Sequence, residues 1–369
     1  MAAPLSIAFF ASSLVSSYWN GAATYYRGLV RALHRLGHRV TFYEPDAYDR
    51  QSHRDLDDPD WAKVVVYPAT ESAALRCLEA ARGADLVVKA SGVGVFDELL
   101  EREVLLLKRE KTQVIFWDVD APATLERIGK NPHDPFRRLV PQYDLVLTYG
   151  GGDPIVGAYG AFGARGCIPV YNALDPDTHF PVQPDPRLQA DLSFLGNRLP
   201  DRESRVEEFF LQVAGELPGK KFLLAGSGWD DKPRAANVSY LGHLGTRDHN
   251  VFNSSPMAIL NISRASMARN GFSPATRVFE AAGAAACMIT DQWEGIEQFF
   301  EPEREIFVAA SGDEVAGILD RLTPQVAAAV GSRALTRVRA EHTYAHRARQ
   351  FEAIFSAGAR GSGAAGGTP

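Results

Sequence analysis

The chain has 369 residues, more than one compact core of about 150 residues accommodates, so at least two domains are expected. Hydrophobic residues make up 46% of the chain and charged residues 23%, which is typical of a folded globular protein and excludes wholesale disorder. The net charge of −6 argues against a nucleic-acid-binding surface and against a polybasic membrane anchor.

The cysteines and the N-terminal residues indicate the compartment. Cys77, Cys167 and Cys287 are too few for a disulfide framework and too far apart for a CxxC metal site, so free thiols in a reducing, cytoplasmic environment are expected. No apolar run approaches the ~18–20 residues of a membrane span, and no integral membrane segment is expected. The apolar start resembles the core of a secretory signal, but the first basic residue is Arg27, and a β-strand over Leu5–Phe10 explains the run better.

Short apolar runs alternate with longer amphipathic stretches along the chain. In the first half the runs are Leu5–Phe10, Arg39–Tyr43, Lys63–Tyr67, Asp85–Lys89, Gln113–Trp117, Asp144–Thr148 and Cys167–Tyr171. In the second half they are Asp191–Leu195, Lys221–Ala225, Asn237–Leu241, Met257–Asn261, Ala286–Thr290 and Glu305–Val308. Short runs with little polar alternation are typical of strands buried on both faces of a parallel sheet. The sequence therefore predicts an α/β protein built from right-handed βαβ units.

A proline-rich gap separates the two sets of runs. The stretch from Asn172 to Asp191 contains four prolines and almost no continuous apolar run, which is typical of an interdomain linker. We therefore expect two Rossmann-like domains facing each other across a cleft. The predicted boundaries are 1–178 for the first domain, 179–333 for the second, 334–355 for a C-terminal helix that packs back across the hinge, and 356–369 for a flexible tail.

Ligands of open α/β sheets bind beyond the carboxyl ends of the strands, so the loops after the runs are the candidate sites. A nicotinamide-dependent enzyme is one alternative, because Glu44 ends the second run, where an acidic residue would hold a ribose. However, the loop after the first run lacks the G-x-G-x-x-G fingerprint. The nearby Gly92–Gly94 pair follows a later strand and has no third glycine in register, which makes this alternative weak.

The most informative segment is NGFSPATRVFEAAGAAACMITDQWEG, from Asn270 to Gly295. Ser273 followed by Pro274 is typical of a helix start, with the serine as N-cap and the proline in the first turn. The N–H groups of the first turn and the Arg277 side chain would then form an anion site. Thr276, Arg277 and Glu280 would share one face, which suits a diphosphate and the neighbouring ribose. An ordinary capped helix with an Arg–Glu pair explains the same spacing.

The order ATRVFEAAGAAACMITDQWEGIEQFFEPEREIFVA resembles the donor-binding half of glycosyltransferases with the GT-B fold, in particular the CgeB-like (spore maturation protein-like) group. The blocks SSYWNGAATYYRGLVRALHRLGHRVTFYEPD and VIFWDVDAPATLERI resemble the first half of that group. DLSFLGNRLPDRESRVEEFF and LNISRASM agree as well, so the likeness covers residues 5–355.

The resemblance implies a set of donor-binding residues. It places Glu280 at the carboxylate that holds the donor ribose and cationic side chains near the diphosphate. Glycine loops would meet the nucleotide base. The implied set is Glu280, Arg277, Arg198, Arg264, Gly226, Gly228 and Gly242, and the helix spacing adds Thr276 beside Arg277. One departure is clear: many retaining members of the superfamily carry a second glutamate eight residues before the ribose glutamate, and Phe272 stands there.

The acceptor side is less defined. Asp118 and Asp120 follow a buried run, and one of them, with Asp120 preferred, would accept a proton from an acceptor hydroxyl as general base. A helix cap and a fixed turn explain the same Asp-x-Asp-x-Pro pattern. Asn20, Gly21 and Gly151 are expected to line the cleft or simply to form tight loops.

The sequence therefore predicts a metal-independent glycosyltransferase without a cofactor. It would move a sugar from a nucleotide-diphosphate sugar, with UDP as the default nucleotide, to an unknown acceptor hydroxyl on a glycan, a protein or a small molecule. No metal ligands and no nucleic-acid partner are expected. Two alternatives remain: a non-catalytic nucleotide-sugar-binding or assembly protein with a degenerate fold, and a sugar-nucleotide epimerase.

Overall fold

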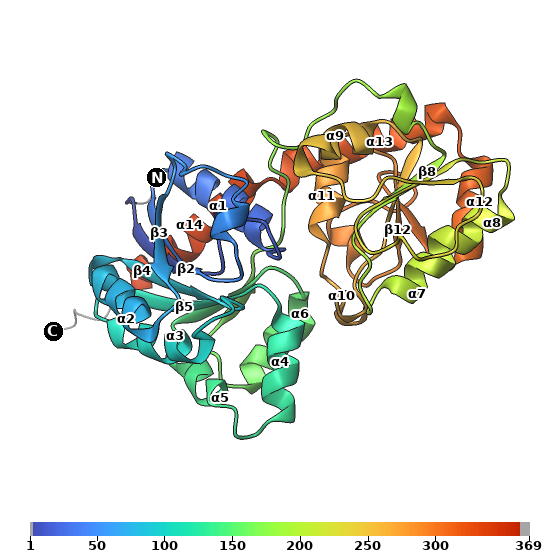
Figure 1. Ribbon diagram of the computed structural model, residues 1–369. Helices are drawn as coiled ribbons and strands as arrows, with labels where there is room; N and C mark the ends of the chain where they lie inside the picture. Colours follow the sequence, from blue (N-terminus) through green and yellow to red (C-terminus); the bar gives the residue numbers. More distant parts are fainter. Residues whose placement is uncertain (1–2, 362–369) are drawn as a thin grey trace. The chain divides into compact units, whose positions relative to one another are not determined.

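The computed structural model describes residues 3–361 of the chain. They form two compact units, the first comprising the chain up to Tyr171 together with the segment from Tyr344 onward, and the second comprising Asn172–Thr343. Figure 1 shows that each unit consists of a central sheet with helices around it. Among the described helices, none is both long and apolar enough to cross a membrane.

The first unit contains a seven-stranded sheet in the order β3-β2-β1-β4-β5-β6-β7, and every pairing is parallel. The strands are β1 (Ser6–Phe10), β2 (Arg39–Asp46), β3 (Lys63–Pro68), β4 (Leu86–Ala90), β5 (Gln113–Asp118), β6 (Leu145–Thr148) and β7 (Cys167–Pro169). All five residues of β4 are buried, as expected of a strand covered on both faces. Every strand predicted for this half is present.

Helices cover both faces of the first sheet. They are α1 (Ala23–Arg35), α2 (Glu71–Ala80), α3 (Asp97–Glu103), α4 (Ala121–Lys130), α5 (Phe136–Leu139), α6 (Gly152–Ala161) and α14 (Tyr344–Gly361). Short 3₁₀ turns are η1 (Gln51–His53), η2 (Ala81–Gly83), η3 (Val104–Leu107) and η4 (Val140–Gln142). Helix α14 lies beside α1 (Figure 1), because Gly28 leaves the space that the ring of Tyr344 fills.

The second unit contains a six-stranded parallel sheet in the order β10-β9-β8-β11-β12-β13. The strands are β8 (Leu192–Leu195), β9 (Phe222–Ala225), β10 (Val238–Tyr240), β11 (Ala258–Asn261), β12 (Met288–Asp291) and β13 (Phe307–Ala309). The predicted strands of this half are all present as well. Together the two parallel sheets confirm the expected α/β class.

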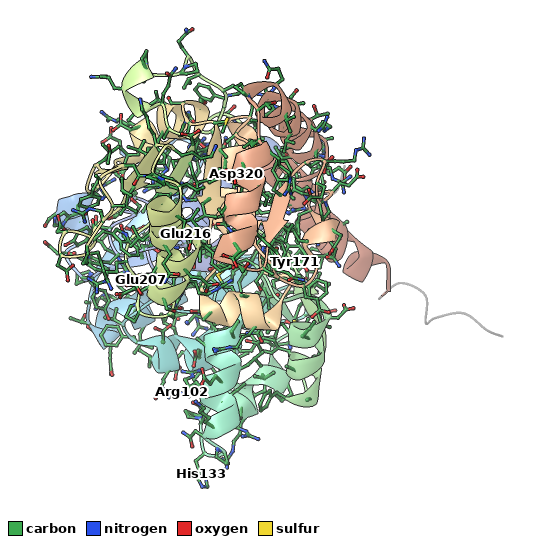
Figure 2. All side chains as sticks on the ribbon, turned by 90° about the vertical axis from the view of Figure 1, so that its right-hand side faces the viewer. Arg102, His133, Tyr171, Glu207, Glu216 and Asp320 are labelled. Atoms are coloured by element: carbon green, nitrogen blue, oxygen red, sulfur yellow. The ribbon has the colours of Figure 1, made fainter. Side chains whose placement is uncertain are left out.

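A second set of helices surrounds this sheet. They are α7 (Glu203–Val206), η6 (a π-helical stretch, Glu207–Gln212), α8 (Val213–Glu216), α9 (His249–Ser254), α10 (Ala265–Asn270), α11 (Thr276–Gly283), α12 (Gly312–Arg321) and α13 (Pro324–Glu341). Short 3₁₀ turns are η5 (Pro186–Leu188), η7 (Thr246–Asp248) and η8 (Ile296–Gln298). The helix that carries Glu207 and Glu216 lies beside α12, which carries Asp320 (Figure 2).

Two segments differ from their predicted roles. The presumed linker from residue 172 to 191 is packed on the second unit: Leu174 is fully buried and bridges to Thr343. Its prolines exclude regular helix and strand but not packing. The single helix expected over 334–355 is two helices, α13 in the second unit and α14 in the first, separated after Glu341.

The predicted tail also differs in part. Residues 356–361 continue helix α14, so the regular backbone extends beyond the predicted end at residue 355. The remainder of the predicted tail, residues 362–369, lies outside the described part of the chain.

Candidate functional site

The carboxyl ends of β8 and β11 form the first candidate site. Strand β8 pairs on one side with β9, the next strand in sequence. On its other side it pairs with β11. The strand order therefore reverses between β8 and β11, the position at which open α/β sheets bind their ligands. The loops after these two strands, together with the start of α11, surround this position.

Helix α11 starts later than predicted. Its first residue is Thr276, and Ala275 is the N-cap with an extended backbone and no side-chain cap, so the prediction of Ser273 as N-cap and Pro274 in the first turn is wrong. The carbonyl of Pro274 accepts a hydrogen bond from Asn172 Nδ2 at 3.4 Å, which holds the chain extended before the helix. The N–H groups of Thr276 and Arg277 still belong to the first turn, where an anion is stabilised.

Three arginines at this edge influence one another electrostatically. Burial, followed by the positive charges of Arg277 and Arg264, lowers the pKa of Arg202 to about 10. Burial also lowers the pKa of Arg277. Within residues 3–361, neither Arg277 Nη1 nor Arg202 Nε, both buried, has a hydrogen-bond partner. Arg264 is exposed, and its Nε lies 2.8 Å from Asp201 Oδ2. Like charges that act on one another are destabilising by themselves, and an anion bound there would offset that cost.

Arg198 is engaged differently. Its Nη1 lies 2.8 Å from Asp231 Oδ1 and its Nη2 lies 2.7 Å from Glu203 Oε1. These carboxylates compensate its charge, and hydrogen bonds to them raise its pKa. The sequence therefore indicates Arg198, whose charge the fold already pairs, and gives no signal for Arg202, four residues later in the same loop.

The predicted glycines serve the close approach of neighbouring loops. Gly226 has a φ of +122°, and a Cβ there would lie 2.2 Å from the Gly196 carbonyl oxygen. Gly228 has a φ of +89° and lies against Arg198, and Gly242 has a φ of +71° with open space around it. The Gly226 N–H donates to the Gly242 carbonyl at 2.7 Å. The loops after β8, β9 and β10 therefore contact one another at this edge, where the nucleotide base of the donor is expected to bind.

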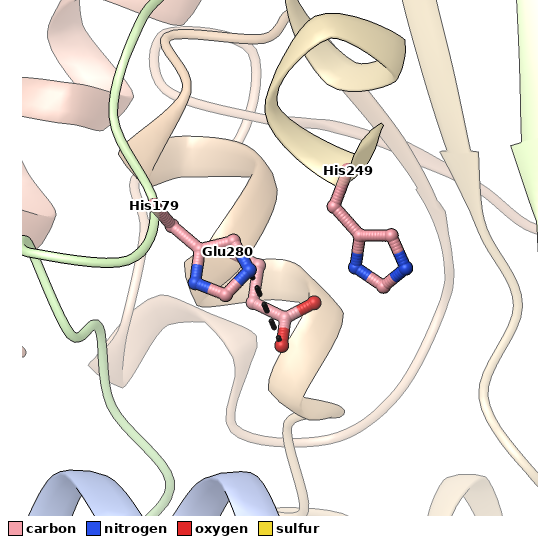
Figure 3. A group of neighbouring side chains, drawn as sticks. All are labelled: His179, His249 and Glu280. Carbon is pink, nitrogen blue, oxygen red and sulfur yellow. Dashed lines mark ion pairs between the residues drawn. The ribbon is translucent and has the colours of Figure 1, made fainter. Parts of the chain in front are cut away.

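Glu280 lies one turn into α11 and faces two histidines. It is 8% exposed, and its Oε1 lies 3.8 Å from Nε2 of the buried His179. His249, at the start of α9, has a buried Nδ1 that lacks a hydrogen-bond partner. Burial acts to raise the pKa of Glu280, but the neighbouring His179, Arg277 and His249 together outweigh burial and leave that pKa lowered. Burial lowers the pKa of His249 to about 4. Figure 3 shows both rings beside the Glu280 carboxyl group.

Gly283 allows the segment from residue 172 to 191 to pack against α11 beside Glu280. It lies three residues after Glu280 on α11, and a Cβ there would lie 2.4 Å from Leu174 Cδ1 and 3.1 Å from the His179 carbonyl oxygen. Residues three apart share a helix face, so the same approach places His179 against Glu280. The sequence offered no signal for this contact, because a solitary histidine in a proline-rich stretch is ordinarily a loop residue.

The carboxyl ends of β4 and β5 in the first unit form the second candidate site. Asp118 ends β5 and is fully buried. Its Oδ1 accepts hydrogen bonds from Ser91 Oγ at 2.7 Å, Thr124 Oγ1 at 3.1 Å and the Asp120 N–H at 3.0 Å, and its Oδ2 accepts one from Tyr159. Burial raises the pKa of Asp118 despite these bonds. The arrangement favours a structural role for Asp118 over that of a base.

Asp120 has a different environment. It is exposed, it stands at the N-cap of α4 without a side-chain cap bond, and it lines a cavity of about 290 Å³. Asp97, Glu101 and Arg127 line the same cavity. Asp97 pairs with the buried Lys89 at 2.7 Å, whereas Glu101 is 4% exposed and lies 3.6 Å from Arg127. Burial raises the pKa of Glu101 to about 7. Of the two predicted general bases, Asp118 and Asp120, only Asp120 is accessible. Glu101 is a further carboxyl group that lines the same cavity.

The other predicted acceptor residues shape loops. Asn20 is buried, accepts from Ser12 Oγ at 2.9 Å and donates to the carbonyls of Ser13 and Ser16. Gly21 is exposed with open space around it. Gly151 has a φ of +96°, and a Cβ there would overlap the side chain of Ile155. Asn20 and Gly151 are therefore explained by local structure alone.

Glu44 is equally occupied. Its Oε1 accepts from Ser13 Oγ at 2.8 Å and Gln51 Nε2 at 2.9 Å, and its Oε2 accepts from the Leu14 N–H at 2.6 Å. The carboxylate is fully buried and holds the loop after β1. Because it is buried and both of its oxygens already accept hydrogen bonds, it is not available to a ribose, which argues against the nicotinamide alternative.

A larger cavity of about 600 Å³ lies elsewhere in the second unit. Asp191, Lys221 and Cys287, each directly before a strand, line it. It therefore lies at the amino ends of the strands, and its lining contains none of the arginines described above. Its size alone does not make it the better candidate, since ligands of such sheets bind at the carboxyl ends.

Residues 202–353 match the model of a family described as glycosyl transferase-like. No curated protein matches the chain. Among solved structures, sucrose-phosphate synthase from Thermosynechococcus elongatus has a TM-score of 0.66 at 13% identity, covering 95% of this chain and 98% of that chain.

Two further structures show the same likeness. Anabaena HepE in complex with UDP and glucose has a TM-score of 0.66 at 13% identity, covering 96% of this chain and 100% of that chain. The T4 phage BGT in complex with UDP-glucose has a TM-score of 0.57 at 14% identity, covering 94% and 98%. The chain therefore has the GT-B fold, as the sequence predicted.

Proposed function

We propose that the protein is a glycosyltransferase that moves a sugar from a nucleotide-diphosphate sugar, UDP in the first instance, to an acceptor hydroxyl. The observation that carries the proposal is the group of Arg202, Arg264 and Arg277 at the carboxyl edge of the second sheet. Two of the three, Arg202 and Arg277, have buried nitrogen atoms that find no hydrogen-bond partner in the described part of the chain. A group of like charges at a helix start is what a diphosphate stabilises.

The donor would lie along the start of α11. Its diphosphate would accept hydrogen bonds from the first-turn N–H groups and the guanidinium groups, and these also stabilise the negative charge that develops when the sugar leaves. Glu280, one turn later, would accept hydrogen bonds from the ribose hydroxyls. In this arrangement the transfer step needs no metal ion, since the arginines and the helix dipole neutralise the leaving diphosphate.

Several observations support this assignment. The glycosyl transferase-like match covers the segment that contains Arg202, Arg264, Arg277 and Glu280. The similar HepE and T4 phage BGT structures contain UDP with glucose and UDP-glucose respectively, which supports a UDP-sugar and a hexose as first candidates. Membership of the CgeB-like group and a cytoplasmic location remain parts of the proposal.

The acceptor would bind to the first unit, at the cavity that Asp120 lines. Asp120 is the accessible carboxylate there and would take the proton from the acceptor hydroxyl. Glu101 lines the same cavity with a pKa of about 7, near the value that suits a general base at neutral pH. Asp120→Asn and Glu101→Gln would tell the two apart, because only the base is needed for turnover after donor has bound.

Nucleotide binding tests the proposal most directly. In metal-chelated buffer, calorimetry is expected to show UDP binding that weakens about 10- to 100-fold in Arg202→Gln and Arg277→Gln, because each loses a charge-assisted hydrogen bond of about 1.5–3 kcal/mol. Glu280→Ala is expected to weaken UDP binding as well. Arg321→Gln, an exposed arginine on α12, is the matched control and should bind UDP as the wild type does. Equal UDP affinity in all four variants would refute the site.

A screen of UDP, GDP, dTDP and CMP sugars by thermal shift would then identify the donor. Slow release of nucleoside diphosphate from one of them supports a transferase. Tight binding without release indicates a non-catalytic binding protein, which the phenylalanine at position 272 makes the main alternative. Conversion of one sugar nucleotide into another without an acceptor would indicate an epimerase.

A further inference from the structure

His179, His249 and Glu280 form a compact cluster in the second unit. Each side chain offers one ligand atom, and these atoms all lie within 4.8 Å of one another. The three residues come from the segment before β8, from α9 and from α11. Figure 3 shows the two rings on either side of the carboxyl group. The cluster is formed by the tertiary structure and corresponds to no metal-binding motif in the sequence.

One ring nitrogen of each histidine in the cluster lacks a hydrogen-bond partner among the described residues. His179 Nδ1 forms a 2.9 Å hydrogen bond with Thr178 Oγ1, which leaves Nε2 as the atom that faces Glu280. Both His179 Nε2 and His249 Nδ1 are buried without a hydrogen-bond partner among the described residues. The 3.8 Å from Nε2 to Glu280 Oε1 is too long for a hydrogen bond. Unpartnered buried polar atoms cost about 1–3 kcal/mol each, so two of them facing one carboxylate call for an explanation.

We propose that His179 Nε2, His249 Nδ1 and the Glu280 carboxylate bind a Zn²⁺ ion, with a water molecule or an anion as the fourth ligand. Zn²⁺ sites with two histidines and one glutamate leave one position open. Bonds of about 2.1 Å at tetrahedral angles place ligand atoms about 3.4 Å apart. The 3.8 Å pair is close to that separation, and all three ligand atoms lie within 4.8 Å of one another.

The ligand set selects the type of metal. Two imidazoles and one carboxylate suit Zn²⁺ and its neighbours in the first transition row, whereas Mg²⁺ and Ca²⁺ prefer oxygen ligands alone. With Nε2 free to bind the ion, His179 Nδ1 carries the proton and donates it to Thr178 Oγ1, which is the kind of contact that orients a metal-ligating histidine. Arg277 adds a positive charge near Glu280, which favours an anion over water at the fourth position.

Zinc binding bears on the donor site through Glu280. A carboxylate that ligates Zn²⁺ is no longer free to hold a ribose, so the ion and the donor would compete. This competition rests on the proposed function, whereas the metal site itself does not. Zn²⁺ would thus act as an inhibitor that sets the fraction of protein able to bind donor.

The test uses the full chain, stripped of metal by a chelator and titrated with Zn²⁺ alone by calorimetry. One equivalent of Zn²⁺ is expected to bind. His179→Gln and His249→Gln should bind it at least about 10-fold more weakly, the loss that removing even a group behind a metal ligand causes. His243→Gln, an exposed histidine in the loop before α9, is the matched control and should bind as the wild type does.

Co²⁺ provides a readout that misfolding cannot imitate. Bound at a four-coordinate site with two imidazoles it gives intense visible absorption, which His249→Gln should lose while its thermal unfolding stays cooperative. Wild-type affinity for Zn²⁺ in both histidine variants, or absence of saturable binding to the wild type, would overturn the proposal. Because no nucleotide is present, neither outcome depends on whether the protein is a glycosyltransferase.

Discussion

The carboxyl edges of the two sheets differ in how their charged groups are satisfied. In the first unit Asp118 and Glu44 are fully buried, and their oxygens accept hydrogen bonds from neighbouring loops. In the second unit Arg202 and Arg277 each have a buried nitrogen that lacks a hydrogen-bond partner among residues 3–361, and in the first unit Arg50 Nε is such an atom. Among these residues Arg50 has no second unpaired arginine beside it and donates from Nη1 to the Ser12 carbonyl, whereas the charges of Arg202 and Arg277 act on each other. Buried polar groups are ordinarily paired, so this pair of arginines suits a ligand better than Arg50 does.

The largest expected effect tests the structural role of the first edge. Asp118→Ala removes the acceptor for Ser91, Thr124, Tyr159 and the Asp120 N–H, and should lower the free energy of unfolding by about 4 kcal/mol. Urea denaturation measures the loss. Asp120→Ala, whose side chain caps nothing, should change the free energy of unfolding by less than about 0.5 kcal/mol. If Asp118→Ala had the same free energy of unfolding as the wild type, the buried carboxyl group would not be holding the loops of the first edge.

Glu101 gives the first unit a dependence on pH. Its folded pKa of about 7 lies above the unfolded value of 4.5, so between these pH values the unfolded chain has released a proton that the folded protein keeps. Stability should therefore fall as the pH rises through this window, by about 3 kcal/mol at about 1.4 kcal/mol for each pKa unit. Glu101→Gln should abolish this fall in urea denaturation between pH 4.5 and 8. An equal pH dependence in wild type and variant would show that Glu101 is not the group responsible.

Gly283 tests the approach of the 172–191 segment to α11. In Gly283→Ala the new Cβ would overlap Leu174 Cδ1, and the expected loss of stability is about 1–3 kcal/mol, measured by thermal and urea denaturation. Displacement of His179 should also weaken Zn²⁺ binding. The control is Gly317→Ala on α12, where only Arg321 comes within 4.0 Å, and it should be neutral or stabilising by up to about 1 kcal/mol. Equal stabilities would mean that the segment moves aside freely.

The smallest expected effect separates paired from unpaired arginines. Arg198 is already compensated by Glu203 and Asp231, so Arg198→Gln should change UDP affinity by less than about 3-fold in calorimetry. Arg202→Gln should weaken the same binding by at least about 10-fold, because its guanidinium group has no carboxylate partner for its buried Nε. If Arg198→Gln weakened UDP binding more than Arg202→Gln did, Arg198 would be the more important diphosphate ligand, as the sequence indicated.

The sequence predicted the strands because buried parallel strands leave a local signal. The runs Leu5–Phe10 and Lys221–Ala225 are short, apolar and bounded by turn residues, and the strands β1 and β9 occupy them within one residue. The start of α11 has a local signal as well, but that signal places the first helical residue at Pro274, two residues before the observed start at Thr276. Asn172, about a hundred positions earlier, holds the Pro274 carbonyl, and no local pattern contains that contact.

The candidate site could be predicted only in part for the same reason. Arg277 and Glu280 share one helical turn, so their spacing revealed them together. His179 and His249 are distant from Glu280 in sequence and meet it only because Gly283 admits the 172–191 segment. Asp118 and Asp120 look equivalent in the sequence, and only burial distinguishes the structural carboxylate from the accessible one.

By itself the sequence determined the α/β class, the two sheets and the loops in which a ligand would be found, because hydrophobic periodicity and turn residues act over a few neighbouring positions. The tertiary structure decided which charges are paired, which carboxylates are buried and which histidines meet a glutamate. Those properties depend on the electrostatic and steric surroundings of each side chain, and the surroundings are supplied by segments far away along the chain.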